Sequence, residues 1–165
     1  ELPFDVTSVP AFDQSRIFLA NANNLLVYGK NNRELLWEAS YDAPVEAILP
    51  TATGLEISLG DGHLVCLDKN GGEKWRKPLP NSLSGGMGSC MAEITNNEDK
   101  RIDRGITVVP LNRGIAVLDS HSGETISELQ LNDPLHHLSS YDDYDLCFYA
   151  VVQRSLVCIE LRIVN

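Results

Sequence analysis

Four segments of the sequence resemble one another, and their spacing restricts the fold more than any other feature. Each contains a short apolar run, and in the first three a turn rich in Asn, Ser and Gly follows; the segments are 24–37, 63–75, 114–125 and 155–160. When Tyr28, Leu67, Leu118 and Ile159 are aligned, successive repeats lie 39, 51 and 41 residues apart. Periods near 40 residues are typical of β-propeller blades and of helical arrays.

The composition inside each repeat distinguishes these two architectures. Every repeat consists of short runs rich in Val, Ile, Leu, Tyr and Phe, separated by Gly, Asn, Asp and Pro, with no helical period of useful length. The sequence therefore excludes a helical array and predicts an all-β fold. The expected strands are 6–12, 16–22, 24–30, 34–41, 45–51, 54–59, 63–68, 73–79, 88–94, 105–111, 114–119, 125–131, 135–140, 146–152 and 155–161.

These runs group into sets of four, four, four and three strands. Four antiparallel strands form one blade of a β-propeller. We expect a single domain, residues 1–165, with blades near 5–42, 43–81, 86–132 and 133–165. The turns agree, because the sequences at 60–62, 69–72 and 120–123 are rich in residues that tolerate the positive φ of a tight hairpin.

The connections between third and fourth strands carry a family resemblance. In the second repeat an apolar strand ends in Leu-Asp68, a Gly72-Glu turn follows, and Trp75 stands three residues after that glycine. This pattern resembles the tryptophan-docking repeat of the pyrroloquinoline-quinone-like β-propellers. The other repeats match it in part: Trp37 occupies the equivalent place but Gly29 replaces Asp, Asp119 and Gly123 keep the turn but Ser127 replaces Trp, and Glu160 stands for Asp.

The resemblance implies a structural role for the two tryptophans. In this family the Trp packs between adjacent blades, so we expect Trp37 and Trp75 to be largely buried at equivalent positions. The resemblance also raises the question of catalysis, because some members are quinone-dependent dehydrogenases. Those enzymes resemble one another through a Cys-Cys pair or a cofactor-stacking Trp, calcium ligands and an Asp base. This sequence has no Cys-Cys pair, and both Trp residues are assigned to docking.

We therefore predict a non-catalytic module for protein–protein interaction or scaffolding, with no catalytic residue, no cofactor and no metal ligand. The alternative is a non-catalytic fragment of a quinone- or metal-dependent oxidoreductase whose active-site blades lie outside this chain. The cysteines, Cys66, Cys90, Cys147 and Cys158, form no C-x-x-C pair, and buried thiols are favoured over a disulfide.

Three further motifs have simpler interpretations. Residues 84–89 are rich in Gly but lack the Lys-Ser/Thr of a phosphate loop, and a blade-to-blade loop is favoured. The acidic run 142–145 lacks the Gly and closing Glu of a calcium loop, so a solvated turn is expected. His136 and His137 would alternate faces of a strand, which predicts at most one useful side chain.

The charge of the chain excludes two classes of partner. There are 13 Lys and Arg against 23 Asp and Glu, a net charge of -10, which would repel a phosphate backbone or an anionic lipid surface. We expect a protein partner, or the remaining part of a larger propeller, and neither nucleic acid nor membrane insertion. The absence of an Asn-x-Ser/Thr acceptor favours an intracellular setting.

Two irregularities suggest contact surfaces. The third repeat has an excess of about ten residues at 95–104, whose charged composition predicts a protruding loop between the first two strands of that blade. It is either a tolerated insertion or a partner-binding loop, whose candidate residues are Asn97, Glu98, Asp99, Lys100, Arg101, Asp103 and Arg104. Because the last set has three strands, we also expect the chain to be part of a larger propeller, with the strands at 155–160 and 6–12 as contact surfaces.

Overall fold

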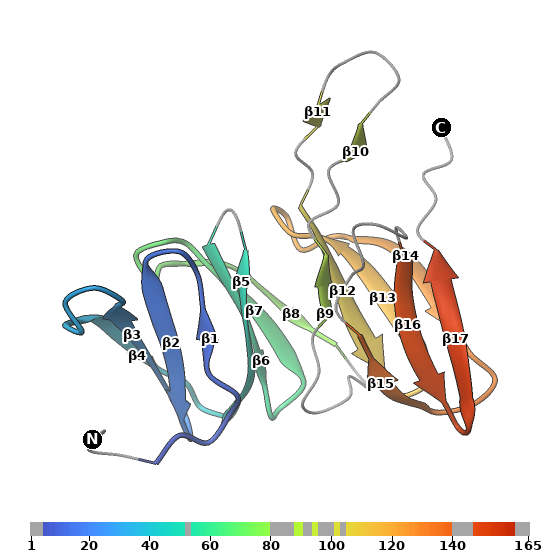
Figure 1. Cartoon of the computed structure of the whole chain (residues 1–165), viewed down its shortest axis with the longest axis horizontal. Helices are drawn as coiled ribbons and strands as arrows, with labels where there is room; N and C mark the ends of the chain where they lie inside the picture. Colours follow the sequence, from blue (N-terminus) through green and yellow to red (C-terminus); the bar gives the residue numbers. More distant parts are fainter. Residues whose placement is uncertain are drawn as a thin grey trace. The chain divides into compact units, whose positions relative to one another are not determined.

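The computed structural model describes residues 5–51, 54–79, 88–90, 94–95, 101–102, 105–139 and 147–160. The chain divides into two compact units, residues 1–80 (unit 1) and 81–165 (unit 2). All regular elements in the described ranges are β-strands, and all paired strands are antiparallel (Figure 1). The all-β prediction is therefore confirmed.

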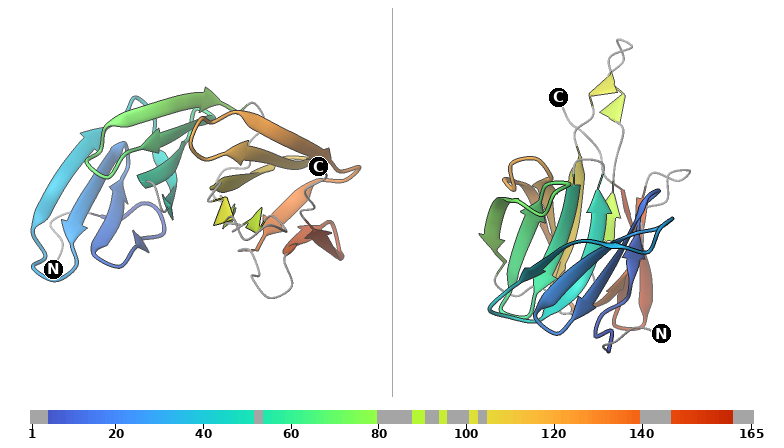
Figure 2. Two further views of the ribbon diagram at one scale, coloured as in Figure 1. Left: turned by 90° about the horizontal axis from the view of Figure 1, so that it is seen from above. Right: turned by 90° about the vertical axis from the view of Figure 1, so that its left-hand side faces the viewer.

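Unit 1 contains two four-stranded sheets, and in each of them the strands are hydrogen-bonded in chain order (Figure 2). The first sheet comprises β1 (Ala11–Phe12), β2 (Arg16–Asn21), β3 (Asn24–Gly29) and β4 (Leu35–Ser40). The second comprises β5 (Val45–Thr51), β6 (Gly54–Leu59), β7 (His63–Leu67) and β8 (Glu73–Pro78).

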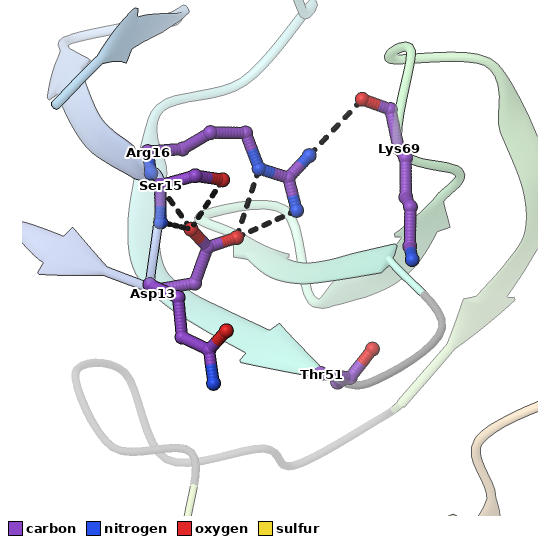
Figure 3. Close-up of a pocket in the computed structure, with 6 residues that line it drawn as sticks. Asp13, Ser15, Arg16, Thr51 and Lys69 are labelled. Atoms are coloured by element: carbon purple, nitrogen blue, oxygen red, sulfur yellow. Dashed lines mark hydrogen bonds and ion pairs between the residues drawn. The ribbon is translucent and has the colours of Figure 1, made fainter. Parts of the chain in front are cut away.

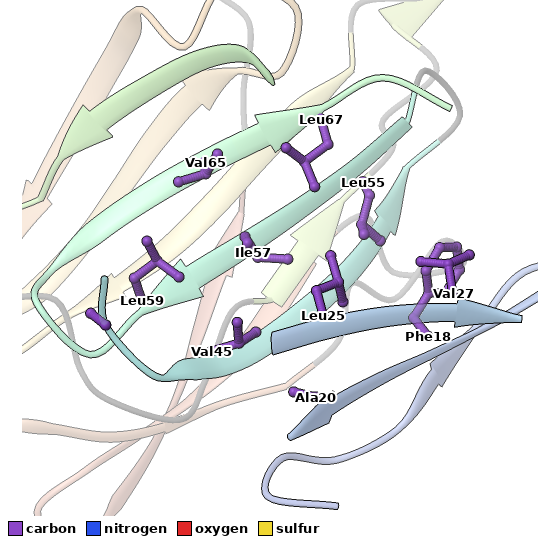
Figure 4. Close-up of a cluster of buried hydrophobic side chains, with 11 residues drawn as sticks. Phe18, Ala20, Leu25, Val27, Val45, Leu55, Ile57, Leu59, Val65 and Leu67 are labelled. Carbon is purple, nitrogen blue, oxygen red and sulfur yellow. The ribbon is translucent and has the colours of Figure 1, made fainter. Parts of the chain in front are cut away.

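The two sheets of unit 1 share one hydrophobic core. Their facing side chains form a continuous cluster that includes Phe18, Ala20, Leu25, Val27, Val45, Leu55, Ile57, Leu59, Val65 and Leu67 (Figure 4). On β3 the buried residues alternate with less buried ones, as expected for a strand with one face toward a core. Burial of these apolar side chains is the main force that holds the two sheets together.

Unit 2 also has two main sheets with a hydrophobic cluster, but one sheet has four strands and the other has three. One sheet has the order β14–β13–β12–β9, and the next has the order β15–β16–β17. A second cluster, with Val108, Ile115, Leu135, Ala150 and Ile159 among its members, lies between them. The strands are β9 (Gly88–Cys90), β12 (Ile106–Leu111), β13 (Gly114–Asp119), β14 (Thr125–Gln130), β15 (Leu135–Leu138), β16 (Cys147–Val152) and β17 (Ser155–Glu160).

The aligned residues of the repeat occupy the same position in all four sheets. Each of them lies on the third strand, at its last residue or one residue before it, and pairs with a residue of the second strand. The pairs are Tyr28 with Ile17, Leu67 with Leu55, Leu118 with Thr107, and Ile159 with Phe148. In the first three sheets the pairing with the fourth strand also shifts register immediately before the aligned residue. The repeat seen in the sequence is thus a repeat of backbone hydrogen bonding.

The first strand is shorter than predicted. Residues 6–12 were expected to be extended, but β1 contains Ala11 and Phe12 alone. Pro10 cannot donate a hydrogen bond to a neighbouring strand, and Val9 beside it is 84% exposed. Only Thr7, whose N–H donates to the Ala20 carbonyl at 2.9 Å, continues the contact with β2.

The charged insertion of the third repeat is more regular than predicted at its base. The strands β10 (Ile94–Thr95) and β11 (Arg101–Ile102) pair there, so Arg101 belongs to a strand. β-branched residues favour extended backbone, which explains why Ile94 and Ile102 pair. The strand predicted at 88–94 corresponds to β9, which contains Gly88–Cys90, and Ile94 belongs to β10 instead. The other candidate binding residues, Asn97, Glu98, Asp99, Lys100, Asp103 and Arg104, lie outside the described residues.

Candidate functional site

An aspartate organises the turn between the third and fourth strands in two of the sheets. The Asp68 carboxylate accepts hydrogen bonds from the backbone N–H of Asn70 at 2.7 Å and of Gly72 at 2.9 Å. These backbone donors, Gly72 first, hold the pKa of Asp68 below its usual value. The Asp119 carboxylate accepts from His121 and Ser122 in the same way, at 2.9 and 3.0 Å.

In each of the first three sheets, the turn between the third and fourth strands contains one residue in the left-handed conformation. This residue comes four positions before Trp37, Trp75 or Ser127, which occupy the docking position of the repeat. The φ angles are 57° at Arg33, 88° at Gly71 and 72° at Gly123. In the second repeat the left-handed glycine is therefore Gly71, not the Gly72 on which the sequence pattern was aligned. The difference arises because this turn is one residue shorter: Asp68 N–H bonds to the Gly72 carbonyl, four residues on, whereas Asp119 N–H bonds to a carbonyl five residues on.

The two tryptophans hold equivalent places on the outermost strands. Trp37 on β4 pairs with Val27, and Trp75 on β8 pairs with Cys66, in both cases next to the register shift. Each side chain is mostly buried, as expected from the sequence, but neither is completely buried. The alternation of exposed and half-buried residues along β4 and β8 gives the reason, since these edge strands keep one face toward solvent.

Trp37 packs on the turn of the next sheet. A Cβ atom placed on Gly71 would approach Trp37 Cε3 to 2.9 Å, closer than real Cβ contacts allow. The indole ring thus lies directly against the Gly71 backbone. The contact joins the first sheet of unit 1 to the β7–β8 turn of the second, and it requires glycine at position 71 for space as well as for conformation.

A second link between these sheets was missed by sequence analysis. Arg16 is paired with Asp13 through Nε at 2.8 Å and Nη2 at 2.7 Å, and its Nη1 donates to the Lys69 carbonyl at 3.0 Å (Figure 3). The guanidinium also lies 5.1 Å from the centroid of the Phe18 ring. The signal that could have indicated it is Asp13-Gln-Ser-Arg16, because an Asp that accepts from residues two and three positions on is typical of a turn.

These side chains line a polar hollow in unit 1. Its volume is about 580 Å³, and its walls are Asp13, Gln14, Ser15, Arg16, Thr51 and Lys69 (Figure 3). The walls come from the β1–β2 turn, the end of β5 and the β7–β8 turn. Every lining side chain carries a polar group, so the hollow is suited to a polar ligand.

The remaining candidate residues divide into buried and exposed ones. The thiols of Cys66 and Cys147 are buried, whereas Cys158 is exposed, contrary to the expectation that it is buried. It lies on β17, where most side chains face solvent. Burial, and secondly the charge of the buried Glu56, raise the pKa of Cys66 to about 11. His136 and His137 on β15 are both exposed.

Within the described residues, no group of three His, Cys, Asp or Glu side chains could hold a metal ion. Nor does that part of the chain contain a helix long and apolar enough to cross a membrane. The acidic run 142–145 and residues 84–87 of the Gly-rich segment lie outside the described residues.

Comparison with solved structures found β-propeller proteins. BBS1N in complex with ARL6DN superposes with a TM-score of 0.76 at 16% sequence identity, over 99% of this chain and 53% of that one. BamB from Moraxella catarrhalis gives a TM-score of 0.67 at 14% identity, over 95% and 47%. The Pan2 WD40 domain from Neurospora crassa gives 0.65 at 14% identity, over 92% and 45%.

No protein-family profile matches the chain, and no curated protein sequence matches it. The identities with these structures show the fold alone. The chain therefore has the fold of β-propeller blades, and it spans about half the length of the natural propellers that it matches.

Proposed function

We propose that this chain is a non-catalytic protein-interaction module built from quinoprotein-like propeller repeats. The observation that carries the proposal is the match over 99% of the chain to BBS1N, which was crystallised with a protein partner, ARL6DN. The likeness transfers the fold and not the partner. Sheets whose turns and outer strands face solvent are a common platform for protein recognition.

The surface of the outer strands supports this proposal. On β14 every residue is exposed, and Ile126 and Leu129 expose 52% and 41% of their surfaces. On β4 the adjacent Leu35 and Leu36 expose 47% and 50%. Exposed apolar side chains on a rigid strand give a partner area to bury without prior rearrangement.

The quinoprotein-like character of the repeats rests on the docking contact. Trp37 lies against Gly71 of the following sheet, and Trp75 holds the same place on its own strand. This arrangement supports the tryptophan-docking repeat as the unit from which the module is built. Asp68 and Asp119, with Gly72 and Gly123, shape the turns on which such docking depends.

The proposal is tested by purification of the tagged chain from its native source, identification of stoichiometric partners, and reconstitution from purified components. We expect one partner to bind the isolated chain with a dissociation constant in the micromolar range or tighter, because protein interfaces of standard size have micromolar to picomolar affinities. Cross-linking with mass spectrometry would place the contact on turns or outer strands. If no purified candidate binds directly, the interaction function is wrong.

A further inference from the structure

The polar hollow of unit 1 has a size compatible with a ligand. Its volume of about 580 Å³ lies within the roughly 300–1,000 Å³ typical of ligand pockets. Two turns and a strand end from both sheets contribute its walls, and the Arg16 bond to the Lys69 carbonyl fixes these turns to each other. The site is thus held by a hydrogen bond between the sheets and not by one mobile loop.

The acidic group of the hollow has its acceptors filled. Asp13 Oδ1 accepts from the N–H groups of Ser15 and Arg16 at 2.8 and 2.7 Å, and Oδ2 accepts twice from the Arg16 guanidinium. Burial opposes ionisation of Asp13, but these bonds and the Arg16 charge outweigh it and hold its pKa below the usual value. The carboxylate and the guanidinium therefore neutralise each other.

The donors that remain belong to Lys69 and Gln14. Neither the Lys69 ammonium nor the Gln14 carboxamide makes a hydrogen bond or ion pair with any residue that the structure describes. Both residues are exposed, so their donors are accessible to a ligand. The Thr51 hydroxyl is closed to solvent and forms part of the wall. The hollow thus presents unused N–H donors and one uncompensated positive charge.

Further cations lie at the same end of unit 1. Lys30 and Arg33 are exposed on the β3–β4 turn, and the Lys30 N–H donates to the Ser15 carbonyl at 2.8 Å, which places that turn beside the hollow. In a chain of net charge -10, these two cations weaken the repulsion that an acidic ligand would meet beside the hollow.

We propose that the hollow receives a carboxylate side chain from an acidic segment of a protein partner. This inference rests on the proposed function and names the chemistry of the partner. A protein is the source because one exposed ion pair improves affinity by about fivefold at most, too little to retain a small free acid. Within a larger interface the same contact fixes register and selects the partner.

The test is a titration of the folded chain, followed by amide NMR, with a short peptide that carries a central Glu-Glu pair. We expect saturable shifts at the Gln14 side-chain amide and at the backbone N–H groups of Ser15 and Lys69. Lys69→Glu should weaken binding by about fivefold, whereas Lys69→Arg, which keeps the positive charge, should bind as the unaltered chain does. Lys74→Glu makes the same change of charge at an exposed residue that does not line the hollow, and it should leave binding unchanged.

Three outcomes would overturn the inference. The first is equal binding of a Gln-Gln peptide, and the second is equal binding by the Lys69→Glu and unaltered chains. The third is competition by sodium acetate at the same concentration as the peptide, which would identify a site for small acids. The proposed function is judged separately: a reconstituted partner that binds the Lys69→Glu chain normally would leave that function intact and refute this site.

Discussion

The contact between Trp37 and Gly71 gives the sharpest test of how the sheets of unit 1 are joined. Gly71→Ala adds a Cβ at a residue with φ of 88°, and this atom would lie 2.9 Å from Trp37 Cε3. Left-handed backbone costs a residue with a Cβ roughly 1–2 kcal/mol. Overpacking typically costs about 1–3 kcal/mol more. We therefore expect Gly71→Ala to lower the free energy of unfolding by about 2–5 kcal/mol.

The chain supplies a matched control at Gly62. Its φ is 83°, and a Cβ there would meet nothing nearer than the Leu79 carbonyl oxygen at 3.5 Å, an ordinary contact. Gly62→Ala should thus lower the free energy of unfolding by the backbone contribution alone, about 1–2 kcal/mol. The difference between the two variants isolates the packing of the indole.

A double-mutant cycle completes the test. Trp37→Ala alone should cost about 2–3 kcal/mol, below the range for fully buried Trp because this side chain is not completely buried. In the Trp37→Ala background, Gly71→Ala should cost no more than Gly62→Ala, which corresponds to a coupling of about 1–3 kcal/mol. Both tryptophans belong to unit 1, so Trp75 fluorescence during urea unfolding reports on this unit in every variant. Equal costs for the two glycine variants, or strict additivity in the cycle, would refute the docking contact.

Three further outcomes follow from titration behaviour. Because the folded pKa of Asp13 lies below 3.8, its ionised form contributes stability that is lost as pH falls through that lowered value. Asp13→Asn should flatten the acid side of a plot of unfolding free energy against pH, and an unchanged slope would contradict this. Burial, and secondly Glu73, raise the pKa of Tyr41 from 10.0 to about 12, so the stability it contributes below pH 10.0 is lost as pH rises toward 12. Tyr41→Phe should remove that alkaline loss, with tyrosinate absorbance showing one fewer late-titrating group. Exposed Cys158 should react with iodoacetamide well before buried Cys66, whose pKa is about 11, as measured by peptide mass spectrometry; similar rates would disprove the assignment.

The sequence was sufficient to predict the sheets because their signals are local and periodic. Val45–Thr51, Gly54–Leu59 and Gly114–Asp119 form strands with the predicted bounds. Two local signals encode these strands: apolar residues recur along each run, and turn residues bound the run at fixed offsets. Neither signal depends on the rest of the chain. The prediction was wrong at residues 6–10, where Pro10 interrupts an otherwise strand-like composition.

The polar hollow could not be predicted in the same way. Asp13 and Arg16 indicate a turn, but nothing in their neighbourhood indicates that Lys69, 53 residues beyond Arg16, supplies the carbonyl to which the guanidinium donates. Such a site depends on how two sheets pack, which local patterns do not encode. The exposure of Cys158 was missed for a related reason, since a strand's apolar letters do not reveal whether a further strand covers it.

The third sheet shows that formation of the hairpin turn and docking of a Trp on the next sheet are separate functions of the repeat. Ser127 stands where Trp is expected, yet the register shift before it and the left-handed Gly123 are the same as in the other turns. The hairpin therefore forms without a docking Trp, and Arg33 with a φ of 57° shows that it forms without glycine as well. What the turn needs is one left-handed residue and partners for its backbone N–H groups. Glycine becomes necessary at Gly71 for a further reason, because Trp37 from the neighbouring sheet occupies the space of its Cβ. The left-handed position thus specifies the hairpin, whereas the Trp and the glycine that it touches specify how one sheet packs on the next.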